Sequence, residues 1–360
     1  MASKVIRFLV AAFLLVPAFS DAQPLDTQTL DKLVLAPDAT PKAFLQMIDR
    51  PRASLTPVQN KLREVDGIEH WQFTFAADEA QRVPGLLLKA TNVSGRRPVV
   101  IALHGTGGSK DEVLDVLEHL AQHGFIGVAI DGRYHGDRSN GGDGYYAYTD
   151  AILRTYRTGK ERPFLYDTVW DVLRLLDYLE TRDDVDARHI GLIGFSKGGM
   201  ETYLAAAVDD RIAVAVPFIG VQSFRWALDN NAWQSRVGTI QPAIVGAARD
   251  EGKSEINTDF VRNFYNRVVP GIADRFDGPQ MLPLIAPRPL LVINGDSDPL
   301  TPVPGLMEVV EKTKTAYAKA NAADKFKFTL QPNTGHDVTP GAFREAIAWL
   351  EQWLKPNGRQ

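Results

Sequence analysis

The 360-residue sequence contains no cysteine. Disulfide bonds, thiolate metal sites and a cysteine nucleophile are therefore excluded. The sequence also lacks an excess of either charge, since 40 Lys and Arg residues stand against 44 Asp and Glu residues. No basic surface thus indicates nucleic acid or anionic lipid as a partner. Beyond residue 22, no segment is apolar enough for membrane insertion.

The first 22 residues differ in character from the rest of the chain. Lys4 and Arg7 give a short positive start, an almost wholly apolar segment runs from residue 8 to 19, and Ser20 and Ala22 supply small residues for a cleavage site. This pattern predicts a secretory signal peptide, and hence a secreted or periplasmic protein without membrane attachment after cleavage. An uncleaved N-terminal anchor is the alternative.

The character of the chain changes at Trp71, where two early strands are expected, and from Val99 onwards short segments that are apolar on both faces alternate with helical stretches. This alternation predicts an α/β fold with one mostly parallel, doubly wound sheet and helices on both of its faces. We expect strands at Trp71–Phe75, Val83–Ala90, Val99–Leu103, Phe125–Ile130, His189–Gly194, Ile212–Val216, Leu290–Asn294 and Phe326–Leu330. We expect helices at Glu112–His123, Leu165–Thr181, Gly198–Val208, Gly305–Ala320 and Gly341–Leu354.

The expected domain organisation has three parts: the signal peptide (1–22), an N-terminal extension with short helices (23–68) and one α/β domain (69–356). The Gly- and Tyr-rich segment 140–163 interrupts the alternation of strands and helices. Residues 221–287 form a longer interruption, which is too long for a plain loop and is expected to fold into helices of its own. We expect this insertion to cap the site and to select the substrate.

The segment Gly194-Phe195-Ser196-Lys197-Gly198 matches the pattern G-x-S-x-G. Such a pattern places a serine on a sharp turn between a strand and a helix, with its hydroxyl above the sheet. The glycines leave room for this turn. Ser196 is therefore our candidate nucleophile, and the alternative is a serine that only caps the following helix.

A serine hydroxyl needs a base, and a histidine base needs a carboxylate to hold its tautomer. His336 follows the last expected strand, in a loop at the edge where a parallel sheet carries its chemistry. A histidine of a surface loop without catalytic role is the alternative. Asp296 and Asp298 both follow the strand 290–294, and either could serve as the acid.

Acyl transfer also needs N–H groups directed at the developing oxyanion. The first expected donor is the backbone N–H of Lys197, the residue after the nucleophile. The second is the N–H of Thr106, with Gly107 as the fallback, in the glycine-rich loop after strand 99–103. His104 and His135 show no spacing typical of metal ligands, so we expect no metal and no other cofactor.

Together these segments resemble the α/β-hydrolase superfamily over about residues 70 to 355. The resemblance rests on His104-Gly105, on Asp131 to Gly136, on the Gly194–Gly198 turn, and on Gly295 to Pro302 with Gly335-His336. In that superfamily the acid often lies in G-x-x-D-x-x-x-P, which places it on Asp298.

The chain is similar to the dienelactone hydrolase and acetyl xylan esterase-like branches. Dienelactone hydrolases proper use a cysteine, which this chain lacks. The resemblance therefore implies a serine esterase that cleaves a small-molecule carboxylic ester through an acyl-enzyme. A peptidase or amidase of the prolyl-oligopeptidase type is the first alternative, although the segment before Trp71 is too short for its propeller. A non-catalytic binding protein that kept the fold is the second. The sequence does not indicate the oligomeric state.

Overall fold

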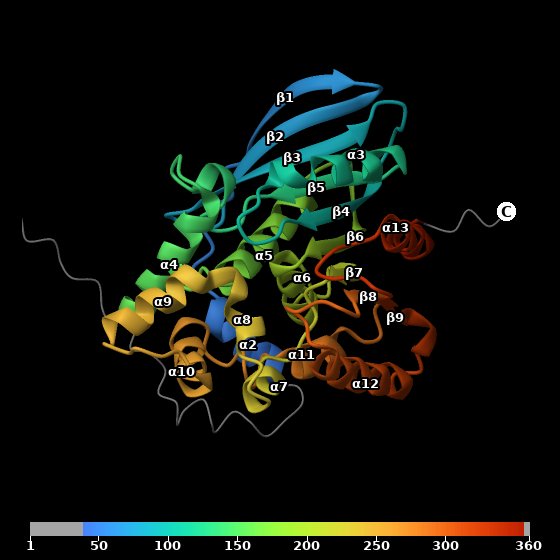
Figure 1. The fold of residues 1–360 in the computed structure, drawn as a ribbon. Coiled ribbons are helices and arrows are strands. Elements are labelled where there is room, and N and C mark those ends of the chain that lie inside the picture. Colours follow the sequence, from blue (N-terminus) through green and yellow to red (C-terminus); the bar gives the residue numbers. More distant parts are fainter. Residues whose placement is uncertain (1–38, 356–360) are drawn as a thin grey trace, which may run out of the picture. The chain divides into compact units, whose positions relative to one another are not determined.

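The computed structural model describes residues 39–355, so the predicted signal peptide lies outside the described residues. Within these residues the chain forms a nine-stranded sheet with the order β1-β2-β3-β5-β4-β6-β7-β8-β9 (Figure 1). The strands are β1 (Val58–Val65), β2 (Ile68–Ala76), β3 (Arg82–Ala90), β4 (Arg97–Leu103), β5 (Ile126–Ile130), β6 (Val185–Phe195), β7 (Ile212–Phe218), β8 (Leu290–Gly295) and β9 (Phe326–Gln331). Strands β5 to β9 run parallel to β4, whereas β1, β2 and β3 pair in antiparallel fashion.

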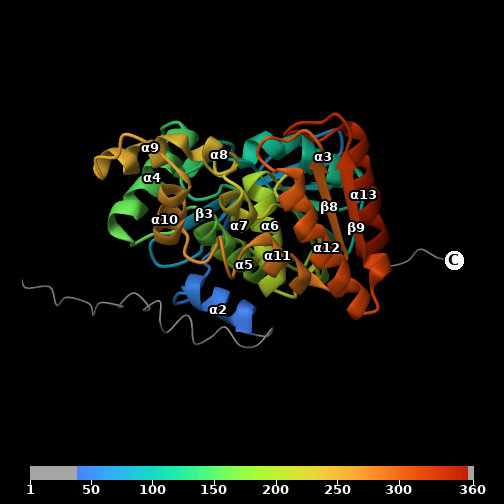
Figure 2. The same cartoon turned by 60° about the horizontal axis from the view of Figure 1, so that its bottom comes forward.

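Helices cover both faces of the sheet, as Figures 1 and 2 show. One face packs against α3 (Leu114–Gln122) and α13 (Pro340–Leu354), and the other against α5 (Tyr166–Glu180), α6 (Lys197–Val208) and α12 (Val303–Lys319). Successive side chains of a strand point to opposite faces of the sheet. In β4, Val99 and Ile101 therefore pack on the face covered by α5, α6 and α12, and Val100 and Ala102 pack on the face covered by α3 and α13. Both faces are therefore buried, which confirms the predicted mostly parallel, doubly wound sheet.

The eight strands and five helices expected from the sequence are all present, with ends shifted by a few residues. Strand β1 was not expected, because residues 58–65 were assigned to the helical part of the N-terminal extension. Its eight side chains are all exposed, so no apolar face marks it in the sequence. Of the described part of that extension, α2 (Ala39–Ile48) is helical.

The two segments that interrupt the alternation form helices. Residues 140–163 contain α4 (Gly144–Thr158). The insertion 221–287 contains α7 (Phe224–Asp229), α8 (Gln234–Val237), η3 (Gly238–Ile240), α9 (Gln241–Asp250), α10 (Thr258–Val268), α11 (Gly278–Met281) and η4 (Leu282–Ile285). The prediction that this insertion folds into helices is thus confirmed. Helix α4 packs against α9 and α10 (Figure 1).

Short 3-10 turns complete the described chain: η1 (Lys110–Val113), η2 (Gly136–Arg138) and η5 (Ala323–Lys325). Among the described helices, none has both the length and the apolar character that a membrane crossing requires. The loops after β4, β6, β8 and β9 leave the sheet at the carboxyl ends of parallel strands, where a sheet of this type places its ligands.

Candidate active site

Ser196 lies on the turn between β6 and α6 with a backbone φ of 56° and ψ of −111°. Such a backbone conformation is strained for a residue with a side chain, and it persists only where the surrounding structure holds it. The Ser196 N–H donates to the carbonyl of Phe218 over 3.0 Å. A Cβ at Gly194 would lie 2.2 Å from the carbonyl oxygen of Gly198, and one at Gly198 would lie 2.4 Å from that of Leu103. Both glycines of the pattern are therefore required sterically.

Three predicted residues are joined by two hydrogen bonds of equal length. The distance from Ser196 Oγ to His336 Nε2 is 2.7 Å, and the distance from His336 Nδ1 to Asp298 Oδ2 is also 2.7 Å. Because an ionised carboxylate only accepts, Nδ1 carries the imidazole proton and Nε2 is free to accept from the serine hydroxyl. The chain of contacts thus has the order and polarity of a serine nucleophile, a base and an orienting acid.

The structure distinguishes the two aspartates that follow β8. The Asp298 side chain is fully buried, and besides His336 it accepts from the Leu300 N–H and the Thr301 hydroxyl. Burial acts to raise the pKa of Asp298, but these hydrogen bonds, led by that from His336, outweigh it and hold the pKa below its usual range. The carboxyl group is therefore ionised near neutrality.

Asp296, by contrast, is exposed and does not contact His336. Its carboxylate accepts from the backbone N–H groups of Asn333 and Thr334. These contacts fix the loop that carries His336. The structure thus places Asp298 beside His336, and Asp296 only shapes the loop that carries His336.

The loop after β4 lies against the serine turn. A Cβ at Gly105 would be 3.7 Å from Ser196 Cβ. The Gly105 carbonyl accepts from His104 Nδ1 at 2.7 Å and from the Gly108 N–H at 3.3 Å. Because N–H and C=O of a trans peptide point in opposite directions, these two bonds also fix the direction of the Thr106 N–H. The predicted donors Thr106 and Lys197 thus lie on two segments that meet beside Ser196.

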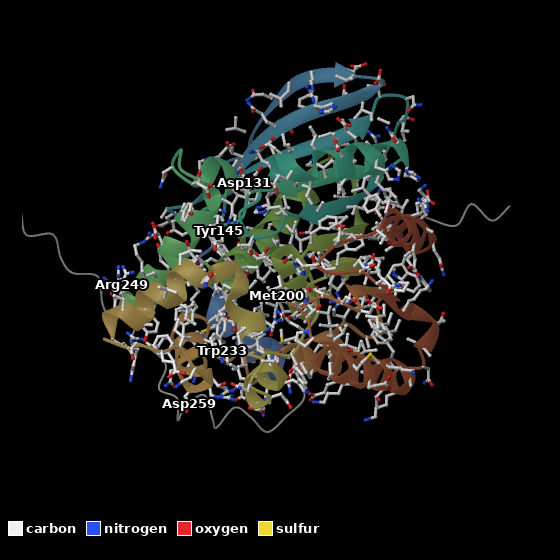
Figure 3. All side chains as sticks on the ribbon, in the orientation of Figure 1. Asp131, Tyr145, Met200, Trp233, Arg249 and Asp259 are labelled. Atoms are coloured by element: carbon white, nitrogen blue, oxygen red, sulfur yellow. The ribbon has the colours of Figure 1, made fainter. Side chains whose placement is uncertain are left out.

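Tyr145 of α4, labelled in Figure 3, supports the same loop from the other side. Gly107 has a φ of +80°, and a Cβ there would lie 3.3 Å from Tyr145 Cβ. A side chain at position 107 would therefore face both backbone strain and crowding.

His104 and His135 form a buried pair behind this loop, with ring centroids 4.9 Å apart. His104 Nδ1 donates to the Gly105 carbonyl, so Nε2 is the acceptor for the Gly132 N–H at 3.0 Å. Burial, aided by the charge of Lys197, lowers the pKa of His104 to about 3. Burial also lowers the pKa of His135. Among the described residues, no three His, Asp or Glu side chains form a group suited to a metal ion.

The Lys197 side chain lies buried beneath the serine turn, although its backbone N–H is the predicted oxyanion donor. Its Nζ donates to both oxygens of Glu201, at 2.8 and 3.0 Å, and both side chains are 1% exposed. An isolated buried charge is costly, and this pairing offsets the cost. This buried pair could not be predicted from the sequence, because i and i+4 charges on a helix are usually exposed.

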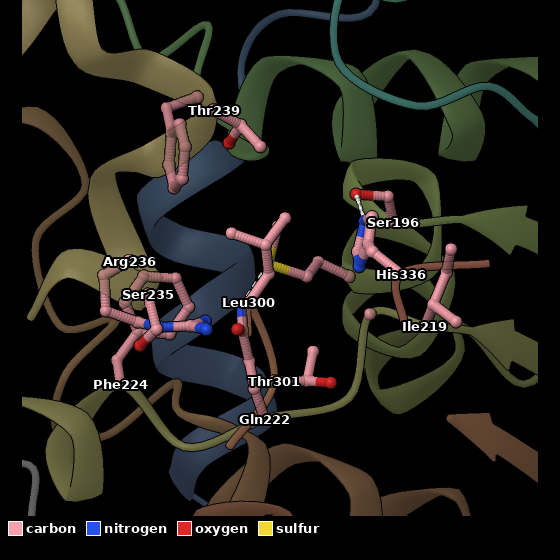
Figure 4. Close-up of a pocket in the computed structure, with 13 residues that line it drawn as sticks. Ser196, Ile219, Gln222, Phe224, Ser235, Arg236, Thr239, Leu300, Thr301 and His336 are labelled. Carbon is pink, nitrogen blue, oxygen red and sulfur yellow. Dashed lines mark hydrogen bonds between the residues drawn. The ribbon is translucent and has the colours of Figure 1, made fainter. Parts of the chain in front are cut away.

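A pocket opens beside the serine turn (Figure 4). It is narrow, with about 30 Å³ of free volume, whereas pockets for drug-sized ligands span roughly 300–1,000 Å³. Its lining comes from the serine turn and α6, from the loops after β7, β8 and β9, from the segment before α5, and from the insertion: Phe164, Ser196, Met200, Ile219, Gly220, Gln222, Phe224, Ser235, Arg236, Thr239, Leu300, Thr301 and His336.

The insertion residues of this pocket were not predicted individually. Gln222, Phe224, Ser235, Arg236 and Thr239 belong to short elements with no motif, and only the long-range packing of the insertion brings them to Ser196. The insertion contains six arginines, and the sequence does not distinguish Arg236, which is buried, from an exposed one such as Arg249.

Comparison with known proteins identifies the family of the chain. The profile of the acetyl xylan esterase (AXE1) family matches residues 47–232, which include Ser196 but end before Asp298 and His336. YtaP of Bacillus subtilis, whose name assigns it only to the hydrolases, is 28% identical over 287 residues, which are 76% of this chain and 84% of YtaP.

Two solved acetyl xylan esterases share the fold. The enzyme from Paenibacillus sp. R4 superimposes with a TM-score of 0.61 at 21% identity, over 87% of this chain and 92% of that chain. The enzyme from Thermoanaerobacterium sp. JW/SL YS485 does so with a TM-score of 0.64 at 17% identity, over 92% and 99%. The fold is thus that of the α/β-hydrolases, as the sequence indicated. The chain belongs to the acetyl xylan esterase (AXE1) family and is a carboxylic-ester hydrolase.

Proposed function

We propose that the enzyme hydrolyses small carboxylic esters through an acyl-enzyme on Ser196, with His336 as general base and Asp298 as orienting acid. The observation that carries this proposal is the pair of 2.7 Å contacts that link the three side chains. A base within hydrogen-bond reach of a serine, itself oriented by a carboxylate, is the arrangement that activates a hydroxyl.

In the first half-reaction the Ser196 oxygen attacks the ester carbonyl carbon while its proton moves to His336 Nε2. The carbonyl oxygen becomes an oxyanion, and we assign the N–H groups of Thr106 and Lys197 as its donors. The C–O bond to the alcohol then breaks, and His336 gives its proton to the leaving oxygen. Asp298 remains ionised throughout and stabilises the imidazolium.

In the second half-reaction a water molecule attacks the acyl carbon. His336 accepts a proton from this water and returns one to the Ser196 oxygen as the acid leaves. The enzyme ends in its starting state, so the cycle needs no metal ion and no other cofactor for its proton and electron balance.

The narrow pocket supports a short substrate. With about 30 Å³ of free volume beside Ser196, a long acyl chain has no room without displacement of Met200 or Leu300. Forcing extra methylene groups into a packed site costs typically about 1–3 kcal/mol. The acetyl xylan esterases among the structural neighbours make acetyl esters of carbohydrates the first natural substrates to test.

The test is hydrolysis of p-nitrophenyl acetate, butyrate and octanoate by the purified protein, with p-nitroacetanilide as the amide counterpart of the acetate. We expect kcat/KM to fall with chain length, by roughly 10- to 100-fold between acetate and octanoate, and the anilide to react far more slowly than the ester. Equal rates for ester and anilide would favour the amidase alternative. A preference for octanoate would contradict the narrow pocket.

A further inference from the structure

Arg236, at the end of α8, lines the same pocket as Ser196 and His336. In Figure 4 it lies across the pocket from the serine and histidine, with Leu300 between them in this view. The residue retains only 5% of its accessible surface. A guanidinium withdrawn from water to this extent is normally paired with a carboxylate.

No such carboxylate is paired with Arg236 among residues 39–355. Its Nε donates to Ser235 Oγ over 3.2 Å, and the guanidinium lies over the Phe224 ring at 5.2 Å from the ring centroid. The buried Nη2 has no hydrogen-bond partner in the described part of the chain. Burial lowers the pKa of Arg236 to about 10, so the group is still a cation near neutrality.

The two acidic residues whose charges act on Arg236 from nearby, Asp277 and Asp298, are already engaged by other donors. Asp277 accepts from the Ser223 hydroxyl and from the backbone N–H groups of Phe224, Arg225 and Gly278. Asp298 accepts from His336, Leu300 and Thr301. Neither carboxylate forms an ion pair with the arginine.

The other buried cations near the site differ in this respect. Lys197 contacts Glu201 at 2.8 Å, Arg133 contacts Asp171 at 2.9 Å, and Lys110 contacts Asp131 at 3.0 Å. Each of these charges is thus balanced by a carboxylate of the protein. Arg236 lines a pocket, and its Nη2 has no partner among the described residues, which is the state expected of a group that binds an anion from outside.

We propose that Arg236 binds a carboxylate of the substrate, so that the enzyme prefers small esters that carry a second, ionised carboxyl group. The inference rests on the proposed role of Ser196, because it assigns the substrate class of that same pocket. A guanidinium offers N–H donors in a planar array that fits a carboxylate. Ser235 accepts from Arg236 Nε and donates its own proton to the Ala232 carbonyl over 2.6 Å, so it orients the guanidinium.

The first test uses the unmodified protein and two pairs of matched esters. Monomethyl succinate is compared with methyl succinamate, and acetoxyacetate with acetoxyacetamide, by pH-stat titration at pH 7.5. Each pair differs only in a carboxylate against a neutral amide, on the acyl side in the first pair and on the alcohol side in the second. Each kcat/KM is divided by the rate constant for alkaline hydrolysis of the same ester.

We expect the carboxylate to be preferred by about 10- to 100-fold in at least one pair, the range for a hydrogen bond to a charged group. Equal normalised rates within both pairs, with p-nitrophenyl acetate still hydrolysed, would overturn this inference and leave the proposed function intact. Failure to hydrolyse any ester would instead overturn the proposed function.

The second test assigns the preference to the arginine. Arg236→Gln removes the charge, Arg236→Lys keeps the charge but loses the planar array, and Arg262→Gln removes a surface arginine of the same insertion, which pairs with Asp229 at 2.7 Å. We expect Arg236→Gln to abolish the ratio between the charged and neutral esters, Arg236→Lys to reduce it, and Arg262→Gln to keep it. A ratio that survives in folded Arg236→Gln would overturn the assignment. If Arg236→Gln does not fold, Arg236→Lys is used in its place. A ratio of charged to neutral ester in Arg236→Lys equal to that of the unmodified protein would then count against the inference.

Discussion

The carboxyl edge of the sheet and the helical insertion 221–287 line the same pocket, but their side chains are held in different ways. Ser196 is fixed by its backbone, through a strained φ, a hydrogen bond to Phe218 and two glycines that tolerate no Cβ. Arg236 is held by a ring contact and one hydrogen bond, and part of its donor capacity is open. The rigid edge is suited to chemistry that all esters share, and the insertion to the choice among them.

If the two regions divide the work in this way, substitutions at the edge should lower kcat/KM for every ester by the same factor. Substitutions in the insertion should instead change the ratio between esters.

The largest effect is expected for Ser196→Ala. Loss of the nucleophile should lower kcat by roughly 10⁶-fold, the order found when a triad serine is removed from another hydrolase. The loss should be the same for acetate and butyrate esters, measured with stopped and continuous p-nitrophenol assays. Ser297→Ala, an exposed serine near the site, is the matched control. Residual rates of Ser196→Ala near those of the control would refute a serine mechanism.

The next effect compares the two aspartates after β8. Asp298→Asn should lower kcat by roughly 10⁴-fold, because an amide favours the wrong tautomer of His336. Asp296→Asn should cost less than about tenfold, since Asp296 only accepts backbone N–H groups of the His336 loop. Steady-state kinetics of both variants across the ester series measure this. If Asp296→Asn is the more damaging substitution, the assignment of the acid is wrong.

The third prediction compares how much stability is lost when a paired buried cation, Lys197, or an unpaired one, Arg236, is removed. Lys197→Met should lower the free energy of unfolding by about 3–5 kcal/mol, because it leaves Glu201 buried without its partner. Arg236→Met leaves no carboxylate behind, so its cost should be clearly smaller. Urea unfolding followed by tryptophan fluorescence measures both. Equal destabilisation by the two substitutions would mean that Arg236 is also paired within the folded protein.

The smallest effect concerns pH and the buried His104. Its folded-state pKa, lowered by burial to about 3, lies below the value of about 6.5 in an unfolded chain. The unfolded state therefore binds the proton first, and the stability that neutral His104 provides is present above pH 6.5 and is lost as the pH falls towards 3. For one proton, the free energy of unfolding changes by at most about 1.4 kcal/mol per pH unit.

The variant His104→Asn tests this pH effect, because its amide can still donate to the Gly105 carbonyl but has no titrating group. Its free energy of unfolding should fall less steeply between pH 6.5 and 4 than that of the unmodified protein. Parallel curves would show that His104 does not contribute to the pH dependence. His135, whose pKa burial also lowers, remains in both proteins and accounts for a residual slope.

The parts of the structure that the sequence predicted correctly are those set by local chemistry. Strands β4 to β8 carry apolar side chains on both faces, and Ser196 lies in a pattern whose glycines are dictated by contacts shorter than 2.5 Å. Strand β1 was missed because all its side chains are exposed. Asp296 and Asp298 both follow β8 within three positions, so in the sequence only the resemblance to the α/β-hydrolases favoured Asp298, and the fold shows that it is the buried one.

Arg236 illustrates what short-range patterns do not contain. Its position beside Ser196 depends on the packing of the whole insertion against α4 and the sheet loops, and its missing partner is a property of the tertiary structure. The residues next to Arg236 in the sequence therefore do not show that it lacks a carboxylate partner in the folded protein.

Covalent labelling tests whether the enzyme has a single activated serine. The purified protein is incubated with a fluorophosphonate, and intact mass, peptide mapping and residual esterase activity are followed together. We expect one label per chain, located on Ser196, with activity lost in proportion to labelling. A label on another residue, or full activity with Ser196 completely labelled, would contradict this expectation.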